Sequence, residues 1–432
     1  MKESIYNYYV PFERKMIIFN GHTKSLFSVS QENASKFKKI LQSPNDYIEK
    51  CPNFLSKMKD YGFVREDNDD EYKEMMETYR ESMFPNYYRL MVLPTYRCNL
   101  SCWYCVQDHR NTDWKAKDML KVKKHLKKYL SSHPNIKDLY LSWFGGEPLI
   151  QYNMVKELSS YAMQTCKEHG VRMQGGITTN SLLLNIDRIK ELANYNINFF
   201  QITLDGDRKE HNKVKCLKGV DTFTKALTNI VNILTFIPNA SVDLRINYKE
   251  STLELVGVID QINEIIPQKM RSRIVVSPKK IWQEDEKSIN QTKLNNFIDK
   301  ISDSGYKVEA VEYGICYVDY KHCTTIFPNG KVDICNLDNP DGRAILGDDG
   351  DVVWYNEDLC FQQSADKENI VCNHCKHFPI CCGPCPVQRN NMIRTTGKVS
   401  CMFSLEEKEE KMEREVTKYY REITNHQQTK IR

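Results

Sequence analysis

Residues 95–109 read TYRCNLSCWYCVQDH and place Cys98, Cys102 and Cys105 in a CxxxCxxC array. The array directly follows YRLMVLPTY (88–96), an apolar run with the length and composition of a buried strand. Three thiolates in one short loop can reach one metal centre and leave a coordination position open for an exchangeable ligand. The spacing alone also allows a zinc site completed by His109, an oxidised pair, or cysteines without a shared role.

Strand-like and helix-like patterns alternate after this array. Each further apolar run is followed by a segment of helix length with apolar residues at three- and four-residue spacing. The runs are DLYLSWF (138–144), VRMQGGITT (171–179), INFFQITL (197–204), VDLRINY (242–248) and SRIVVS (272–277). Six consecutive units predict a parallel α/β sheet, either doubly wound or a partial barrel, with its chemistry at the C-terminal strand ends.

The residues before this core have a different pattern. They contain three short strand-like runs, YNYYVPF (6–12), KMIIFN (15–20) and SLFSVS (25–30). Helical patterns follow at 31–41 and 45–58, and the acidic stretch REDNDDEYKE (65–74) is typical of a solvated linker. We therefore predict a small N-terminal α+β domain over 1–80 and a core domain over 88–304.

Beyond residue 310 the apolar periodicity weakens, and cysteine, glycine and proline become frequent. The segment SLEEKEEKMEREVTKYYREI (404–423) predicts a closing helix opened by a serine cap. We predict a third, cysteine-rich domain over 310–432, whose small core indicates that it depends on bound metal for its fold.

Composition narrows the class of protein. The 61 Lys and Arg residues against 57 Asp and Glu residues give a net charge of +4, too weak at this length to indicate a nucleic-acid or anionic-membrane partner. No apolar run of membrane-spanning length and no secretory signal occurs, so we expect a cytoplasmic protein with no nucleic-acid or membrane partner. In a reducing compartment, 16 cysteines suggest metal binding rather than disulfides.

With WFGGEPL (143–149) at the end of the second strand, residues 88–304 resemble the radical S-adenosylmethionine (SAM) superfamily. The resemblance implies a partial (β/α)6 TIM-like barrel in which Cys98, Cys102 and Cys105 hold a [4Fe-4S] cluster. An electron passed from this cluster splits SAM, its ligand, into methionine and a 5'-deoxyadenosyl radical. The residues implied to bind SAM are Gly145, Gly146 and Glu147 at its ammonium group, Asn180 in a TNG-like element, Thr203, and Arg245 at its carboxylate or ribose.

The segment QITLDGDRKEHNKVK (201–215) resembles the SLDG...HD..R element of family members that act on proteins and peptides. Asp205, Gly206 and His211 match that element. Thr203 replaces its serine, Asn212 its aspartate and Lys215 its arginine.

The C-terminal cysteines resemble the SPASM domain, which carries two auxiliary [4Fe-4S] clusters in peptide- and protein-modifying radical SAM enzymes. The resemblance assigns Cys316, Cys323, Cys335 and Cys385 to the first cluster, and Cys372, Cys375, Cys381 and Cys401 to the second. Cys382 adjoins Cys381 and competes with it as a ligand. A zinc knuckle that uses His374 and His377 is the alternative for this region.

Full-length matches of this kind are peptide maturases or anaerobic sulfatase-maturating enzymes. Because 97 residues precede Cys98, we expect a peptide maturase whose winged-helix-like N-terminal domain binds a precursor peptide as an added strand. Its reaction would form a thioether or carbon-carbon crosslink, with flavodoxin or ferredoxin as electron donor. Formylglycine formation in a sulfatase and a non-catalytic scaffold remain as alternatives, and Asp205, Asp319 and Tyr313 are candidate general bases.

Overall fold

The computed structural model describes residues 1–83, 85–107, 109–249, 256–281, 283, 291–308, 316–336, 342–355, 371–401 and 403–429. The chain forms two compact units. Unit 1 comprises Met1–Phe84, Val311–Tyr320 and Phe361–Arg432, and unit 2 comprises Pro85–Ala310 and Lys321–Cys360. The division into three domains stays a prediction, and Tyr313 lies outside the described residues.

In the described residues, unit 2 is built on one sheet of eleven strands in the order β12-β11-β10-β9-β8-β7-β6-β13-β14-β15-β16. Its six predicted strands are confirmed and pair in parallel, each beside the next in sequence. They are β6 (Tyr87–Val92), β7 (Asp138–Trp143), β8 (Arg172–Thr178), β9 (Ile197–Leu204), β10 (Ser241–Tyr248) and β11 (Ile274–Lys280). β12 (Lys307–Val308) adds a short parallel strand.

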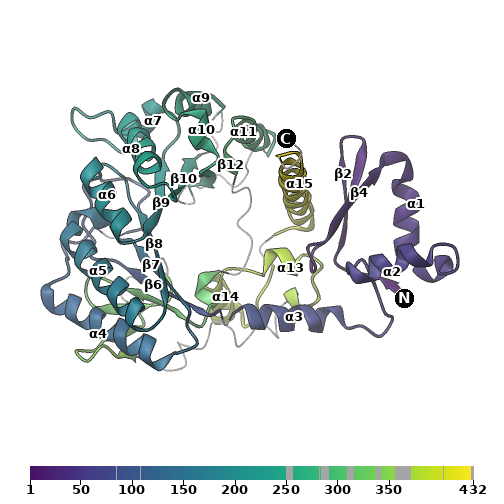
Figure 1. Cartoon of the computed structure of the whole chain (residues 1–432), viewed down its shortest axis with the longest axis horizontal. Helices are drawn as coiled ribbons and strands as arrows, with labels where there is room; N and C mark the ends of the chain where they lie inside the picture. The colour runs from purple at the N-terminus through teal and green to yellow at the C-terminus, as the bar shows by residue number, and fades with distance from the viewer. Residues whose placement is uncertain are drawn as a thin grey trace. The chain divides into compact units, whose positions relative to one another are not determined.

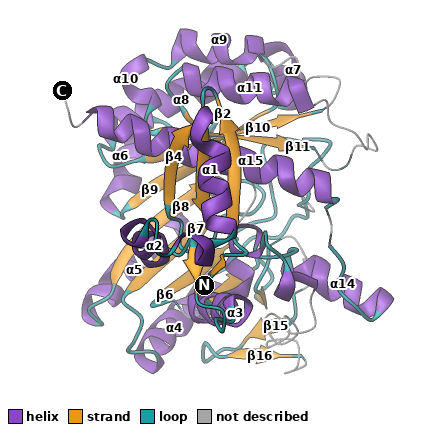
Figure 2. Ribbon diagram, turned by 90° about the vertical axis from the view of Figure 1, so that its right-hand side faces the viewer, coloured by secondary structure: helices purple, strands orange, loops and turns teal. Residues whose placement is uncertain are grey.

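This strand order decides between the two sheet types. A doubly wound sheet reverses direction at a switch point, whereas β6 to β11 advance in one direction only. Right-handed crossovers then place every connecting helix on the same face, and the sheet curves into a partial barrel. Figure 1 shows α4, α5, α6 and α8 along the outer side of these strands, which are orange in Figure 2.

The helices of unit 2 follow the predicted alternation. They are α4 (Ala116–Ser132), η2 (Pro148–Gln151), α5 (Tyr152–Glu168), α6 (Ile186–Asn194), α7 (Arg208–Val214), α8 (Thr222–Phe236), α9 (Val256–Ile265), α10 (Gln268–Arg271) and α11 (Gln291–Asp303). Alternate residues of each strand, such as Leu139, Leu141 and Ile202, are fully buried against these helices. The intervening residues face the inside of the barrel, and many there are polar and only partly buried.

In the C-terminal part of the chain, β13 (Cys323–Ile326) and β14 (Lys331–Asp333) form an antiparallel hairpin, with Gly330 at a φ of 76° in the turn. Its position was not expected. β13 pairs in parallel with β6, so the hairpin extends the core sheet, which β15 (Ala344–Leu346) and β16 (Val352–Trp354) complete.

Unit 1 contains the three predicted N-terminal strands as an antiparallel sheet: β2 (Asn7–Phe12), β3 (Lys15–Asn20) and β4 (Leu26–Ser30). Successive residues of the central strand β3 face opposite sides. Ile17 and Phe19 pack with Val416 of α15 (Leu405–Thr429), whereas Ile18 packs with Leu41 of α1 (Gln31–Gln42). Both faces are therefore covered (Figure 1), and within the described residues neither β2 nor β4 pairs with a further strand along its outer edge.

The remaining elements of unit 1 are short, apart from α15 and α3. They are β1 (Lys2–Glu3), η1 (Pro44–Tyr47), α2 (Pro52–Asp60), β5 (Val64–Arg65), α3 (Glu71–Ser82), η4 (Tyr317–Asp319), η6 (Val371–His374), α13 (Phe378–Cys381) and α14 (Pro386–Thr396). The serine cap of α15 is confirmed, because Ser404 Oγ accepts from the N–H of Glu407 at 3.1 Å. Within the described residues, no helix is both long and apolar enough to cross a membrane.

The interpretation of 65–74 as a solvated linker is wrong for its second half. Asp70 caps α3 by accepting from the N–H of Lys73 at 3.1 Å, and acidic residues in the first turn suit the helix dipole. Glu71 is buried, where its carboxylate accepts from Ser4 Oγ at 3.1 Å and from the N–H of Ile5 at 2.8 Å. The acidic residues therefore start a helix that is anchored to the first strands.

Candidate functional site

The cysteine array lies in the loop after β6, at the C-terminal end of the barrel strands as predicted. The pKa of the Cys102 thiol is raised to about 11, chiefly by burial; Lys215 opposes this rise, and the charges of Asp205, Cys105 and Cys98 contribute to it. The three thiols therefore lie close enough to influence one another. Bound iron would replace their protons, because coordination by a metal deprotonates a thiol outright.

His109, the residue of the zinc alternative, lies with Nε2 3.2 Å from Cys105 Sγ. Among the described residues, no group of three or more His, Cys, Asp or Glu side chains is arranged to hold a metal ion. The ligand assignment of this loop stays a prediction.

Gly145 and Gly146 seat the loop after β7 against the cysteine loop. The N–H of Gly146 donates to Thr95 O at 3.1 Å, and that of Glu147 to Arg97 O at 2.8 Å. A Cβ atom on Gly146 would lie 2.2 Å from Arg97 O, and Gly145 has a φ of 126°. Only glycine allows this approach of two backbones, so the pair has a structural reason in addition to its predicted contact with SAM.

Glu147 is fully buried and ties three loops together. Its carboxylate accepts from the N–H of Leu149 at 3.1 Å, from Thr179 Oγ1 at 2.8 Å and from the N–H of Asn180 at 2.8 Å. Burial raises its pKa to about 7, against the opposing effect of these hydrogen bonds. Both carboxylate oxygens are thus engaged within the protein, and the contact of Glu147 with an ammonium group stays a prediction.

Asn180 touches the cysteine loop directly. Its Nδ2 donates to Asn99 Oδ1 at 2.7 Å and lies 3.8 Å from Cys98 Sγ. Ser181, which stands where the resemblance has glycine, adopts a φ of 65°, in the left-handed region that favours glycine. The backbone therefore keeps the conformation of a TNG-like turn although the residue differs.

Thr203 and Arg245 are direct neighbours on β9 and β10, and both face the inside of the barrel. Each side chain is partly exposed, and Arg245 Nε donates to Asn247 Oδ1 at 2.8 Å. The structure thus brings both residues to the inner surface of the barrel near its C-terminal rim, as a ligand contact would require.

Asp205 lies at the centre of a buried network that the sequence did not reveal. Its Oδ1 accepts from the hydroxyl of Tyr104, within the cysteine array, and from Asn247 Nδ2 at 3.0 Å. Lys215 Nζ lies 3.6 Å from its Oδ2 and donates to Thr203 O at 2.6 Å. Burial and Lys215 lower the pKa of His211 to about 3, so this imidazole is neutral. Asp205 therefore braces the cysteine loop.

A chain of polar side chains crosses the inside of the barrel. Thr178 Oγ1 donates to Gln201 Oε1 at 3.2 Å, and Gln201 Nε2 donates to Asp243 Oδ2 at 2.7 Å. Ser277 Oγ donates to Asp243 Oδ1 at 2.5 Å. Sequence reasoning missed this chain, although polar residues that alternate with buried ones in otherwise apolar strands were its signal.

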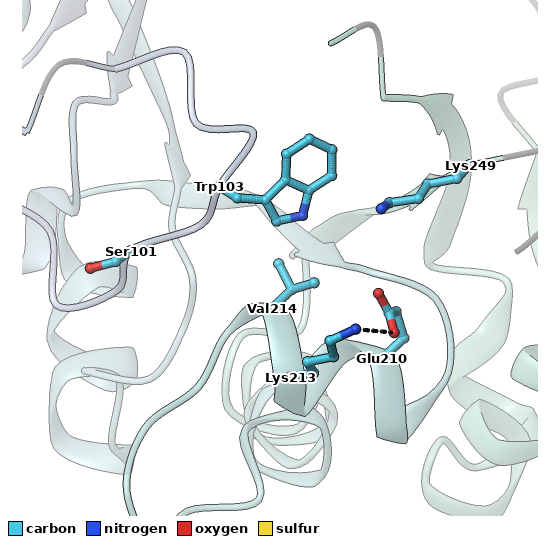
Figure 3. A pocket seen from close by; sticks show the side chains of 6 residues that line it. All are labelled: Ser101, Trp103, Glu210, Lys213, Val214 and Lys249. Carbon is cyan, nitrogen blue, oxygen red and sulfur yellow. Dashed lines mark ion pairs between the residues drawn. The ribbon is translucent and has the colours of Figure 1, made fainter. Parts of the chain in front are cut away.

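A cavity of about 440 Å³ lies beside the cysteine loop at the rim of the barrel (Figure 3). Trp103, which is 50% exposed, forms one wall, and Lys249 Nζ lies 4.4 Å from the centre of its ring. The residues that line the cavity are Ser101, Trp103, Glu210, Lys213, Val214 and Lys249. Trp103 and Tyr104, which are neighbours in the array, thus have different surroundings. Trp103 lines this cavity, whereas the hydroxyl of Tyr104 is hydrogen-bonded to Asp205.

The second predicted auxiliary set lies within unit 1. Burial raises the pKa of Cys381, and the charges of Cys375 and Cys401 raise it further, so these three thiols are near one another. Cys382 instead adopts a φ of 55°, and its charge acts on Lys24. Cys382 nevertheless packs in the same apolar cluster as Cys372 and Cys375, so the choice between Cys381 and Cys382 stays a prediction. Cys372, the fourth member, is buried, with Sγ 3.4 Å from the place of a Cβ on Gly383.

The first predicted set draws on both units, with Cys316 and Cys385 in unit 1 and Cys323 and Cys335 in unit 2. It stays a prediction. Asp319, a candidate base, is buried beside Arg389, and burial raises its pKa to about 6.

Comparisons with known proteins identify the core. Residues 92–254 match the model of the radical SAM superfamily. Fe-coproporphyrin III synthase of Methanosarcina barkeri is 26% identical over 170 residues, which are 39% of each chain. An uncharacterised protein of Methanocaldococcus jannaschii is 32% identical over 136 residues, which are 32% of this chain and 40% of that protein. The matched part thus spans about two fifths of these relatives' length.

The structure of anSMEcpe with bound AdoMet and the Cp18Cys peptide has a TM-score of 0.53 to this chain and is 17% identical. The match covers 80% of this chain and 100% of that one. At this identity the likeness concerns the fold, and it extends well beyond the matched core.

Proposed function

Because residues 92–254 match the radical SAM superfamily model, we propose that this chain generates a substrate radical on a ribosomally made peptide and so forms a thioether or carbon-carbon crosslink. When bound, the [4Fe-4S] cluster and SAM supply the 5'-deoxyadenosyl radical that removes a hydrogen atom from the peptide. The chain's own residues hold these groups in place, position the peptide and exclude water.

The chemistry and common location of several side chains support binding of the cluster and SAM. Cys98, Cys102 and Cys105 share a loop that Glu147, Asn180 and Asp205 brace from three strand ends, and no fourth cysteine lies in that loop. Thr203 and Arg245 add polar groups on the inner barrel surface for the carboxylate or ribose of SAM.

The peptide substrate is supported chiefly by the edge of the N-terminal sheet. The N–H of Asn20 donates to Ser25 O and that of Gln31 to Arg14 O, both at 2.9 Å. Hydrogen-bonded and non-hydrogen-bonded pairs alternate along an antiparallel ladder. The backbone groups that point away from β3 are therefore those of Leu26, Ser28 and Ser30.

The opposite edge is less suited to an added strand. The N–H of Gly21 donates to Tyr6 O at 2.9 Å, so Tyr6 and Gly21 form a hydrogen-bonded pair. By the same alternation along β2, the backbone groups that point away from β3 are those of Asn7, Tyr9 and Pro11. Pro11 has no N–H, and Asn7 donates its own to Ser4 O at 3.3 Å. We therefore infer that a precursor peptide adds to β4, as an extended partner adds to a sheet edge.

The Ser28→Pro variant tests this inference, because it removes an outward N–H without breaking the ladder to β3. We expect at least a tenfold weaker affinity for the precursor peptide, measured by fluorescence anisotropy, and the yield of 5'-deoxyadenosine without peptide unchanged. The matched control is Tyr9→Pro on β2. Equal affinity of Ser28→Pro and wild type would refute the β4 edge.

The reaction itself is tested with anaerobically purified protein, SAM and dithionite. 5'-deoxyadenosine and loss of hydrogen mass from a co-expressed precursor peptide are the expected products. Formylglycine in a sulfatase peptide would instead establish the alternative of a sulfatase-maturating enzyme. Absence of 5'-deoxyadenosine would leave a non-catalytic scaffold.

Two auxiliary [4Fe-4S] clusters and an electron donor such as flavodoxin or ferredoxin complete the proposal. Iron, sulfide and zinc per chain test the clusters: about twelve irons are expected for three cubanes, and about four irons with zinc would reduce the C-terminal region to a zinc module.

A further inference from the structure

Cys316 and Cys385 of unit 1 each lie directly before a helix, η4 or α14, and a buried ion pair joins these two helices. The N–H of Asp319, in η4, donates to Cys316 O at 2.8 Å. The N–H of Arg389, in α14, donates to Cys385 O at 2.9 Å. Asp319 and Arg389 thus each lie one turn after a cysteine that the SPASM resemblance assigns to the same cluster.

The two turns are joined through their side chains. Arg389 Nη2 lies 2.5 Å from Asp319 Oδ1, and both residues are about 95% buried. Tyr79 Oη donates to the other carboxylate oxygen, Asp319 Oδ2, at 2.9 Å. The carboxylate therefore has a partner on each oxygen, which fixes the orientation of both turns.

The tyrosine comes from the N-terminal segment. Tyr79 lies on α3, and its ring packs against Phe378 with centroids 5.1 Å apart. The apolar face of α3 also carries Met75 and Met76, which belong to the same buried cluster as Cys372. One helix thus contacts the surroundings of both predicted auxiliary sets.

A buried ion pair is weak evidence for stability, because apolar residues of the same volume often serve as well. Its better use is to impose one geometry on the groups around it. Here those groups are Cys316 and Cys385, whose backbones receive the first hydrogen bond of each turn.

We propose that Tyr79, Asp319 and Arg389 are positioning residues that hold Cys316 and Cys385 as two ligands of one iron-sulfur cluster. The N-terminal segment is then part of a metal site as well as a peptide-binding element. This inference rests on the proposed auxiliary clusters.

The experiment compares wild type with Tyr79→Phe and Asp319→Asn as full-length, anaerobically purified protein. Tyr79→Phe keeps the ring against Phe378 and removes only the hydroxyl. The matched control is Tyr6→Phe, which removes another buried hydroxyl from the same cluster, one that contacts Glu71 O at 3.4 Å. The readouts are iron and sulfide per chain, iron loss to a chelator, and electron paramagnetic resonance (EPR) spectra of the reduced clusters.

We expect Asp319→Asn to lose about four of twelve irons, the content of one cubane, while the EPR signals of the other clusters persist. Tyr79→Phe should release this iron at least tenfold faster than wild type, and Tyr6→Phe should match wild type. Unchanged iron content and release in both variants would overturn the inference, as would parallel loss of all clusters through unfolding. Wild type with only about four irons would instead overturn the proposed auxiliary clusters themselves, and the inference with them.

Discussion

Replacing Gly146 with alanine would place a Cβ atom 2.2 Å from Arg97 O and 2.4 Å from Tyr96 O. Both neighbours are backbone atoms, so no flexible side chain can move aside, and the cysteine loop must shift. The shift costs about 1–3 kcal/mol for overpacking. Loss of the hydrogen bonds from Gly146 and Glu147 adds about 0.5–1.5 kcal/mol each. We therefore expect unfolding free energy to fall by about 2–6 kcal/mol.

The assay is urea unfolding of the cluster-free protein followed by circular dichroism, together with iron content after anaerobic purification. Gly257→Ala in α9 is the matched control, because nothing lies within 4 Å of a Cβ there and alanine is favoured over glycine in helices by about 0.5–1 kcal/mol. If Gly146→Ala unfolds at the same urea concentration as wild type and holds as much iron, the close contact between Gly146 and the cysteine loop is not needed for the stability of that loop.

Three further changes test the site. Because the pKa of Glu147 is raised, the native state binds more protons than the unfolded state between pH 4.5 and about 7. The free energy of unfolding should therefore fall as pH rises through that window and level off above it. Urea titrations of Glu147→Gln should lack this dependence on pH. Cys381→Ser should lose about four irons per chain and Cys382→Ser none, and elemental analysis that finds equal loss would contradict the assignment. Lys215→Met leaves the Asp205 carboxylate without its cation and should lower the unfolding free energy by about 3–5 kcal/mol, whereas Lys215→Arg should lower it less.

The barrel was predictable because its signals are local. Each core strand is an apolar run between turn residues, and the cysteine array and glycine pair fall at strand ends. The brace on the cysteine loop was not predictable, because Tyr104 and Asp205 are 101 residues apart and meet only when parallel strands align their C-terminal ends. The same holds for Gln201 and Asp243, whose contact depends on strand register.

The linker prediction failed for a related reason. Charge in 65–74 indicates solvent exposure, but Tyr72 packs against the buried cluster that contains Met75, and Glu71 is hydrogen-bonded to Ser4 and Ile5. Whether an acidic residue at the start of a helix is exposed or buried depends on tertiary contacts, and composition does not show these contacts.

The sheet β2–β4 has a consequence for synthesis. It leaves the ribosome long before α15, yet the face that carries Ile17 and Phe19 is covered by Val416 and Tyr420, nearly four hundred residues later in the chain. Contacts of such separation form slowly, and exposed apolar faces invite association meanwhile. We therefore expect nascent chains to need chaperone protection until α15 emerges, and α15 truncations to aggregate through this N-terminal sheet.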